Sequence, residues 1–264
     1  MCLKKLPEGL RNASERIIRE KETLMPGKRD EMIGSLLYQE DREKILAMVR
    51  KMGNMVSEAI ADAVHSLEVR DNELADRIID ADDIVDDLEV AIDQECLSSI
   101  ALRQPVRKDL RFVFAVLKII TDLERIGDQA VNIAKRAKAL NRYPLLKPLV
   151  DIPKMRDIAI GMLRDALTSF EKEDPVLAEE VCMRDEALDE FDVSIFDELT
   201  GIMAAQPTGD AGIVHRAAGL MWVSRHLARV GDHATNVSER AYFMVRGERL
   251  KPLIEARRKS GGGR

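Results

Sequence analysis

Apolar residues recur every three or four positions along most of the chain, which is the spacing expected for one face of an α-helix. A run from Leu36 to Leu67 predicts one long amphipathic helix. Asp71 follows at an N-cap position, and the next apolar run predicts a second helix. This helix should end before Gln104, because the residue before a proline is disfavoured in the α conformation. A third helix is expected over about residues 106–140.

The same pattern appears a second time, 103 or 104 residues later. Residues 155–170 match 52–67, and Asp174 takes the N-cap position of the second copy. Both third helices contain Arg-(Ile/Val)-Gly-Asp-x-Ala-x-Asn, at 125–132 and at 229–236. Such self-similarity indicates an internal duplication. We therefore predict an all-α protein built from two tandem antiparallel three-helix bundles.

The repeats divide the chain into four parts. They are an N-terminal extension at 1–35 with a short helix between Asn12 and Leu24, a first repeat at 36–145, a second repeat at 150–248, and a basic flexible tail at 249–264. The formal charge of −6 is uneven, since the extension carries +2 and the tail +5, which leaves −13 on residues 36–248. This acidic body argues against general nucleic-acid binding, which needs a basic face.

Composition agrees with a helical protein. Only ten of 264 residues are aromatic, and 15 glycines and 9 prolines are few for this length, which argues against β-sandwiches and barrels with their frequent turns. No apolar run reaches the ~20 residues that span a bilayer, and the first 25 residues show no signal peptide. Three cysteines without a CxxC pair fit a reducing compartment. We expect a cytoplasmic protein.

Carboxylates cluster on predicted helical faces in both repeats. Spacing by four places three oxygen-bearing side chains along one face of the third helix, Glu124, Asp128 and Asn132. The second helix carries Asp82, Asp83 and Asp86, and its copy carries Asp185, Glu186 and Asp189. Such oxygen ligands suit Mg²⁺, Mn²⁺ and oxidised iron, and a cation or a basic partner would offset the repulsion between like charges. The alternative is a solvated acidic face.

Signatures of catalysis are missing from the sequence. A ferritin-like di-iron centre needs ExxH motifs, which none of the four histidines completes, and neither HExxH nor GxSxG occurs. Gly127 and Gly231 lie inside predicted helices, where close packing explains a glycine better than a phosphate-binding loop does. Cys182 and Trp222 are expected to be packing residues. His233 is expected to be either a metal ligand or an exposed polar residue.

Three stretches carry a resemblance to the PhoU family of phosphate-uptake regulators. They are ECLSSIALRQPVRKDLR at 95–111, KIITDLERIGDQAVNIAKRA at 118–137 and HLARVGDHATNVSERAYFMVRGE at 226–248. The resemblance implies a cytoplasmic, non-enzymatic regulator that links the ATPase of the Pst phosphate ABC transporter to a sensor histidine kinase. It also implies negative regulation of uptake and starvation signalling when phosphate is plentiful, and a homodimer.

The resemblance further implies metal clusters at E(D)xxxD motifs on the bundle surface. The first motif is intact as Glu124 and Asp128, whereas Ala228 stands where the second motif usually has Glu. The residues carried over are Asp82, Asp83, Asp86, Glu124, Asp128, Asn132, Asp185, Glu186, Asp189, Asp232, Asn236 and Glu239. The implied metal is Fe, Zn, Mn or Mg. We expect the first repeat to hold it more tightly, because ligand charge sets affinity.

Other functions stay open at this point. A metal-binding or storage protein, in which cation binding is itself the function, would use the same acidic faces. An accessory of another phosphate carrier would share the same fold. A small carboxylate–metal hydrolase is a third alternative, for which the sequence offers no general base.

Overall fold

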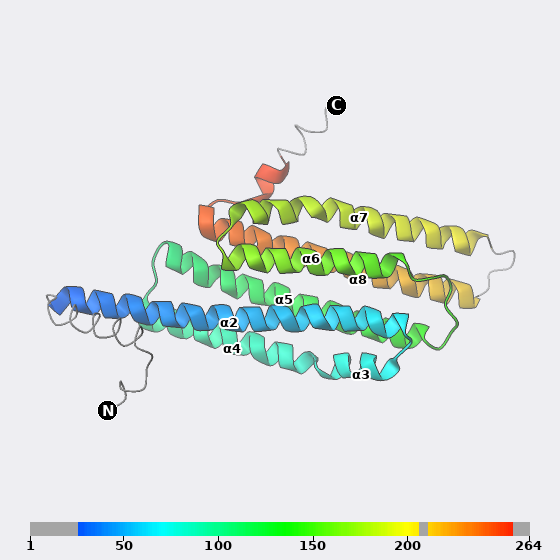
Figure 1. Cartoon of the computed structure of the whole chain (residues 1–264), viewed down its shortest axis with the longest axis horizontal. Helices are drawn as coiled ribbons and strands as arrows, with labels where there is room; N and C mark the ends of the chain where they lie inside the picture. The colour runs from blue at the N-terminus through cyan, green and yellow to red at the C-terminus, as the bar shows by residue number, and fades with distance from the viewer. Residues whose placement is uncertain (1–25, 206–210, 256–264) are drawn as a thin grey trace, which may run out of the picture.

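The computed structural model describes residues 26–205 and 211–255, with side chains from residue 37 onward (Figure 1). This part of the chain contains α-helices and no β-strand. The helices are α2 (Pro26–Glu68), α3 (Asn72–Asp80), α4 (Asp82–Arg103), α5 (Lys108–Leu140), α6 (Asp151–Glu171), α7 (Pro175–Ala204) and α8 (Ala211–Arg246). The short helix expected between Asn12 and Leu24 lies outside the described residues. None of the described helices combines the length and apolarity that crossing a membrane requires.

Two antiparallel three-helix bundles follow one another along the chain, as predicted. The first contains α2, α3 with α4, and α5, and the second contains α6, α7 and α8 (Figure 1). The bundles join along their length, because α5 packs against α8 and α2 packs against α6. The rings of Phe112 and Phe170 stack across this junction with centroids 5.7 Å apart. One hydrophobic core therefore runs through both repeats.

Both repeats make the same turn between their first and second helices. Arg70 and Glu173 have left-handed φ angles of 62° and 54°. The next residues, Asp71 and Asp174, donate their N–H to a carbonyl five residues earlier, at 2.9 and 2.8 Å, which is the bond that closes a Schellman motif. Both aspartate side chains then accept backbone N–H bonds as N-caps, each of which typically stabilises a helix by about 1 kcal/mol. The predicted caps are confirmed.

The second helix of the first repeat is interrupted, although the sequence pattern predicted one continuous helix. The break falls at Ala81, between α3 and α4. It places Asp82 and Asp83 in the first turn of α4, where carboxylates are stabilised by the positive end of the helix dipole. The equivalent α7 continues through this position, where Arg184 replaces Ala81 and binds Asp165 of α6 at 2.6 Å.

The two ends of the described chain also differ from the prediction. α2 begins at Pro26, ahead of the expected start near Leu36, since proline is accepted in the first turn of a helix. Residues 249–264 were predicted to be a flexible tail, of which 256–264 lie outside the described residues. In the described part, Leu250 and Ile254 are only 1% and 7% exposed. They pack with Ala178, Cys182 and Tyr242 in a small separate core.

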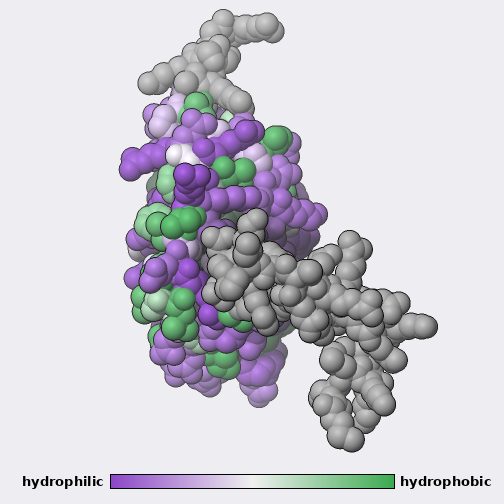
Figure 2. Space-filling view, turned by 90° about the vertical axis from the view of Figure 1, so that its left-hand side faces the viewer, coloured by the Kyte–Doolittle hydropathy of each residue, from purple (hydrophilic) through white to green (hydrophobic). Residues whose placement is uncertain are grey.

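The end of the molecule that faces the viewer in Figure 2 has a mostly hydrophilic surface with scattered apolar patches.

Candidate functional site

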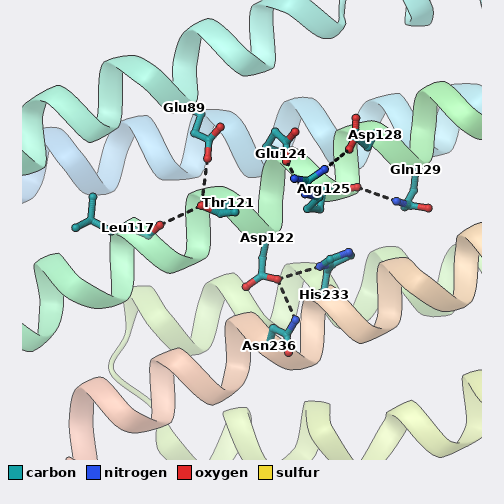
Figure 3. Close-up of polar contacts among 10 residues, drawn as sticks. All are labelled: Glu89, Leu117, Thr121, Asp122, Glu124, Arg125, Asp128, Gln129, His233 and Asn236. Carbon is teal, nitrogen blue, oxygen red and sulfur yellow. Dashed lines mark hydrogen bonds and ion pairs between the residues drawn. The ribbon is translucent and has the colours of Figure 1, made fainter.

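The first acidic cluster lies where α4 runs beside α5. Glu89 of α4 accepts a hydrogen bond from Thr121 Oγ1 of α5 at 3.2 Å, which shows that the two helices face each other here (Figure 3). Arg125 sits between two carboxylates of its own helix, with Nε 3.2 Å from Glu124 Oε2 and Nη1 3.1 Å from Asp128 Oδ2. Glu124 and Asp128, both predicted to be metal ligands, thus form ion pairs with the same arginine, Arg125.

Crowding of carboxylates changes the acidity of this cluster. Burial, followed by Asp86 and Asp128, raises the pKa of Asp82 above its usual value. Burial, followed by Asp128, also raises the pKa of Glu124, although Arg125 opposes the shift. Both shifts follow from taking a carboxylate out of water and placing it near like charges. A cation bound between α4 and α5 would lower these pKa values again, because it would offset the repulsion between the carboxylates.

The carboxylates are within electrostatic range of one another without forming a shell of ligands. Across the described residues, no three His, Cys, Asp or Glu side chains are close enough together to hold a metal ion. Asp83 is exposed and Asn132 is half-buried. Hard oxygen donors on neighbouring helices have the chemistry that Mg²⁺ or Mn²⁺ prefers, but a metal would require these side chains to converge. The predicted metal ligands stay a prediction.

The second acidic cluster opens into a cavity of about 390 Å³. The cavity is lined by Cys182, Asp185, Asp232, Thr235, Asn236, Glu239, Lys251, Ile254 and Glu255. Burial and then Asp189 raise the pKa of Asp232, while Arg225, His233 and Arg229 oppose the shift. Lys251, which belongs to the segment predicted to be a flexible tail, places its positive charge in the lining of this cavity. Glu186 is exposed outside the cavity, and Ala228 is buried.

Two polar contacts cross the junction between α5 and α8, and sequence reasoning missed both. Asp122 Oδ1 lies 2.9 Å from His233 Nδ1 and accepts a bond of 3.0 Å from Asn236 Nδ2 (Figure 3). His226 Nδ1 lies 2.8 Å from Gln129 Oε1. His233, predicted to be a ligand beside Asp232 or an exposed polar residue, is partly buried and turns its Nδ1 toward Asp122, and the amide of Asn236 is aimed at the other repeat.

The two contacts occupy equivalent positions. The offset of 104 residues relates Asp122 to His226 and Gln129 to His233, so each repeat contributes one member to each pair. Their chemistry differs, because one histidine faces a carboxylate and the other faces an amide. Burial, together with Arg136 and Arg229, lowers the pKa of His226 to about 4, so this ring is neutral at pH 7. The repeat offset could have shown that these four residues occupy two equivalent pairs of positions, although it does not show which residues are in contact.

Trp222 was predicted to fill either the core or an interface, and it is not part of the core. Its side chain is 51% exposed. The ring lies 6.1 Å from the ring of His226 and 5.5 Å from the guanidinium carbon of Arg136. Trp222 therefore covers the outer edge of the α5–α8 junction, next to the neutral histidine. Cys182, in contrast, is buried as predicted.

Comparison with known proteins assigns the fold and both repeats to a class of phosphate-transport accessory proteins. The family model of the PhoU domain matches residues 49–137 and again 152–241. The chain belongs to the PhoU family. The family resemblance noted from the sequence is thereby confirmed.

Relatives match over most of their own length. The chain is 35% identical to the phosphate-specific transport system accessory protein PhoU homolog of Clostridium acetobutylicum, over 81% of this chain and 96% of that one. The corresponding homolog of Aquifex aeolicus is 39% identical over 79% and 93%. The crystal structure of PhoU from Pseudomonas aeruginosa superposes with a TM-score of 0.74 at 32% identity, covering 80% of this chain and all of that one. For the phosphate transport system regulatory protein PhoU from Streptococcus pneumoniae, the TM-score is 0.72 at 27% identity, with 82% and 99% covered.

Proposed function

We propose that the protein is a non-enzymatic adaptor in phosphate homeostasis. It contacts the ATPase of a phosphate ABC transporter and a sensor histidine kinase, and it reduces uptake and starvation signalling when phosphate is plentiful. The observation that carries this proposal is the duplicated PhoU domain, which matches relatives named as accessory proteins of phosphate-specific transport over nearly their whole length. The proposal places the protein in the cytoplasm as a homodimer.

Exposed acidic faces supply the means of contact. Exposed carboxylates of α4 include Asp83, Asp86 and Asp87, and those of α7 include Glu186, Asp189 and Glu190. Complementary charge speeds and orients the encounter of two proteins. A basic surface on the ATPase or on the kinase would therefore dock on α4 or α7.

Purified components test the adaptor directly. The tagged protein is mixed with the cognate transporter ATPase or with the cytoplasmic part of the kinase, at high and at low phosphate, and the retained partner is quantified. We expect both partners to bind and the amount retained to depend on phosphate. Retention of neither partner under any condition would contradict the proposal. Light scattering of the same sample checks the homodimer.

Cation binding by the acidic clusters is the second candidate function. It is supported by the raised pKa values of Asp82 and Glu124, which follow first from burial and then from repulsion by neighbouring carboxylates. Fe, Zn, Mn or Mg would stabilise the ionised carboxylates there. The first repeat holds the metal more tightly, because the second lacks the carboxylate that Ala228 replaces.

Metal analysis of two matched variants tests this asymmetry. Asp128→Ala is expected to remove most of the bound metal and Asp232→Ala to remove little, since each deletes the equivalent carboxylate of one repeat. Bound metal per chain is measured after equilibration with Mn²⁺ or Fe²⁺. Equal occupancy in the two variants would contradict the asymmetry.

A further inference from the structure

A groove that is open in the first repeat is filled in the second. It has a volume of about 250 Å³ and lies beside the break between α3 and α4, where α2 and α5 form its other walls. Its lining is mostly apolar: Met55, Ala59, Leu74, Ile78, Ala81, Val85, Gly127, Ala130 and Val131, with Glu58, Asp62, Arg77 and Asp82 also lining it. For scale, a dry apolar cavity of about 150 Å³ holds a benzene ring. This groove has room for one or two bulky aliphatic side chains.

Larger side chains close the equivalent space of the second repeat. Three small residues of the first groove, Ala59, Ala81 and Val85, correspond by the repeat offset to Met162, Arg184 and Leu188. Met162 and Leu188 are 0% and 1% exposed. Leu188 reaches so far toward α8 that a Cβ on Gly231 would lie 2.3 Å from its Cδ2, whereas a Cβ on Gly127 would lie 3.6 Å from Val85. The open groove is therefore a property of the first repeat.

The charge at the groove also differs between the repeats. Within the described part of the chain, neither Glu58 nor Asp62 forms a salt bridge, and both are exposed. In the second repeat Gly161 replaces Glu58, and Asp165, the counterpart of Asp62, is neutralised by Arg184. Asp82 adds a third carboxylate to the first groove, against the single cation of Arg77. The groove thus combines an apolar floor with a net negative edge.

We infer that this groove receives a segment of a partner protein that carries one or two bulky aliphatic side chains flanked by lysine or arginine. The inference rests on the proposed adaptor function and names the surface through which the transporter ATPase or the kinase docks. The aliphatic side chains enter the apolar floor, and the flanking cations face Glu58, Asp62 and Asp82. A buried apolar anchor surrounded by complementary charge is the usual composition of a protein–protein hot spot.

The protein contains an intramolecular example of this kind of contact. Leu250 and Ile254 bury their side chains against α7 and α8, while Lys251 lies in the acidic cavity with Asp185 and Asp232. An aliphatic pair with a neighbouring lysine is thus accepted by the acidic surface of the second repeat. Within the described part of the chain, the groove of the first repeat is lined by α2 to α5 and is not covered by another segment.

Filling the groove tests the inference on the full-length protein. Ala59→Met introduces the side chain that the second repeat uses at this place, and Ala47→Met adds the same side chain at an exposed position of the same helix. Affinity for the purified ATPase and for the cytoplasmic part of the kinase is measured for each variant. We expect Ala59→Met to weaken at least one partner by about tenfold or more, and Ala47→Met to stay within about twofold.

A second variant avoids any change in packing. Glu58→Lys reverses an exposed charge at the groove and is compared with Glu43→Lys, which reverses an exposed charge elsewhere on the same helix, α2. Glu58→Lys is expected to weaken the same partner and to reduce the dependence of its affinity on salt. Wild-type affinity in both Ala59→Met and Glu58→Lys would overturn the groove inference and leave the adaptor function standing. Failure of the wild-type protein to bind either partner would overturn both.

Discussion

The two repeats share one fold and one pair of turns, yet they differ where function is expected. The first repeat has a broken second helix, an open groove and an intact Glu124–Asp128 motif. The second has a continuous α7, a groove closed by larger side chains, and an acidic cavity that Lys251 enters from the C-terminal segment. A duplicated protein can in this way keep one copy for stability and leave the other open for binding.

The largest expected effect concerns the C-terminal segment, which only the second repeat has. Leu250→Ala should lower the free energy of unfolding by about 2 kcal/mol, because it empties a buried leucine site. Leu253→Ala is the control, since Leu253 is 40% exposed and its loss should cost less than about 0.5 kcal/mol. Urea unfolding measures both. Equal midpoints and slopes in the two variants would show that the segment is a solvated tail.

The equivalent glycines of α5 and α8 should respond to alanine with opposite signs. Gly231→Ala forces Leu188 to move, and overpacking of this kind costs about 1–3 kcal/mol. Replacing a glycine inside a helix by alanine stabilises the helix by about 1 kcal/mol. The free energy of unfolding of Gly231→Ala is therefore expected to fall by about 1 kcal/mol. Gly127→Ala has ordinary contacts and should gain up to about 1 kcal/mol. Calorimetry that gave both variants the same sign would contradict the comparison.

A pH-dependent effect concerns the histidine of the α5–α8 junction. The pKa of His226 is about 4 in the folded protein, below its ordinary value of 6.5. Between these pH values the unfolded chain binds a proton that the folded chain does not, so the free energy of unfolding falls as the pH drops through this window. His226→Gln should flatten that part of the profile, while the exposed His215→Gln should not. An NMR titration of His226 near pH 6.5 would disprove the shift.

Much of the fold could be predicted from the sequence, because helix periodicity and capping are local. Asp71 and Asp174 were identified as caps from their positions alone, and both hold in the structure. The break at Ala81 was not predictable in this way, since alanine favours helix and the apolar spacing continues through it. The docking of Leu250 was also missed, because a short stretch between basic residues gives no helical pattern.

The candidate site was predicted less completely. Carboxylates at regular spacing identified the acidic faces, but spacing cannot say which side chains converge. Asn236, expected as a metal ligand, lines the second acidic cavity and also donates to Asp122 of the other repeat. That contact depends on the alignment of α5 against α8, which no local pattern specifies. The open groove depends on three small residues, one on α2, one at the break between α3 and α4, and one on α4, and only the comparison of the repeats in space reveals it.

Hydrogen exchange on the complex with the transporter ATPase, or with the kinase, tests the central claim most directly, because it reads both repeats in one experiment. The account predicts that partner binding slows amide exchange in the walls of the first groove, at residues 55–62 and 74–85. The equivalent segments of the second repeat, 158–165 and 177–188, should change little. Protection of equal size in both repeats, or protection confined to the second, would contradict the division of roles.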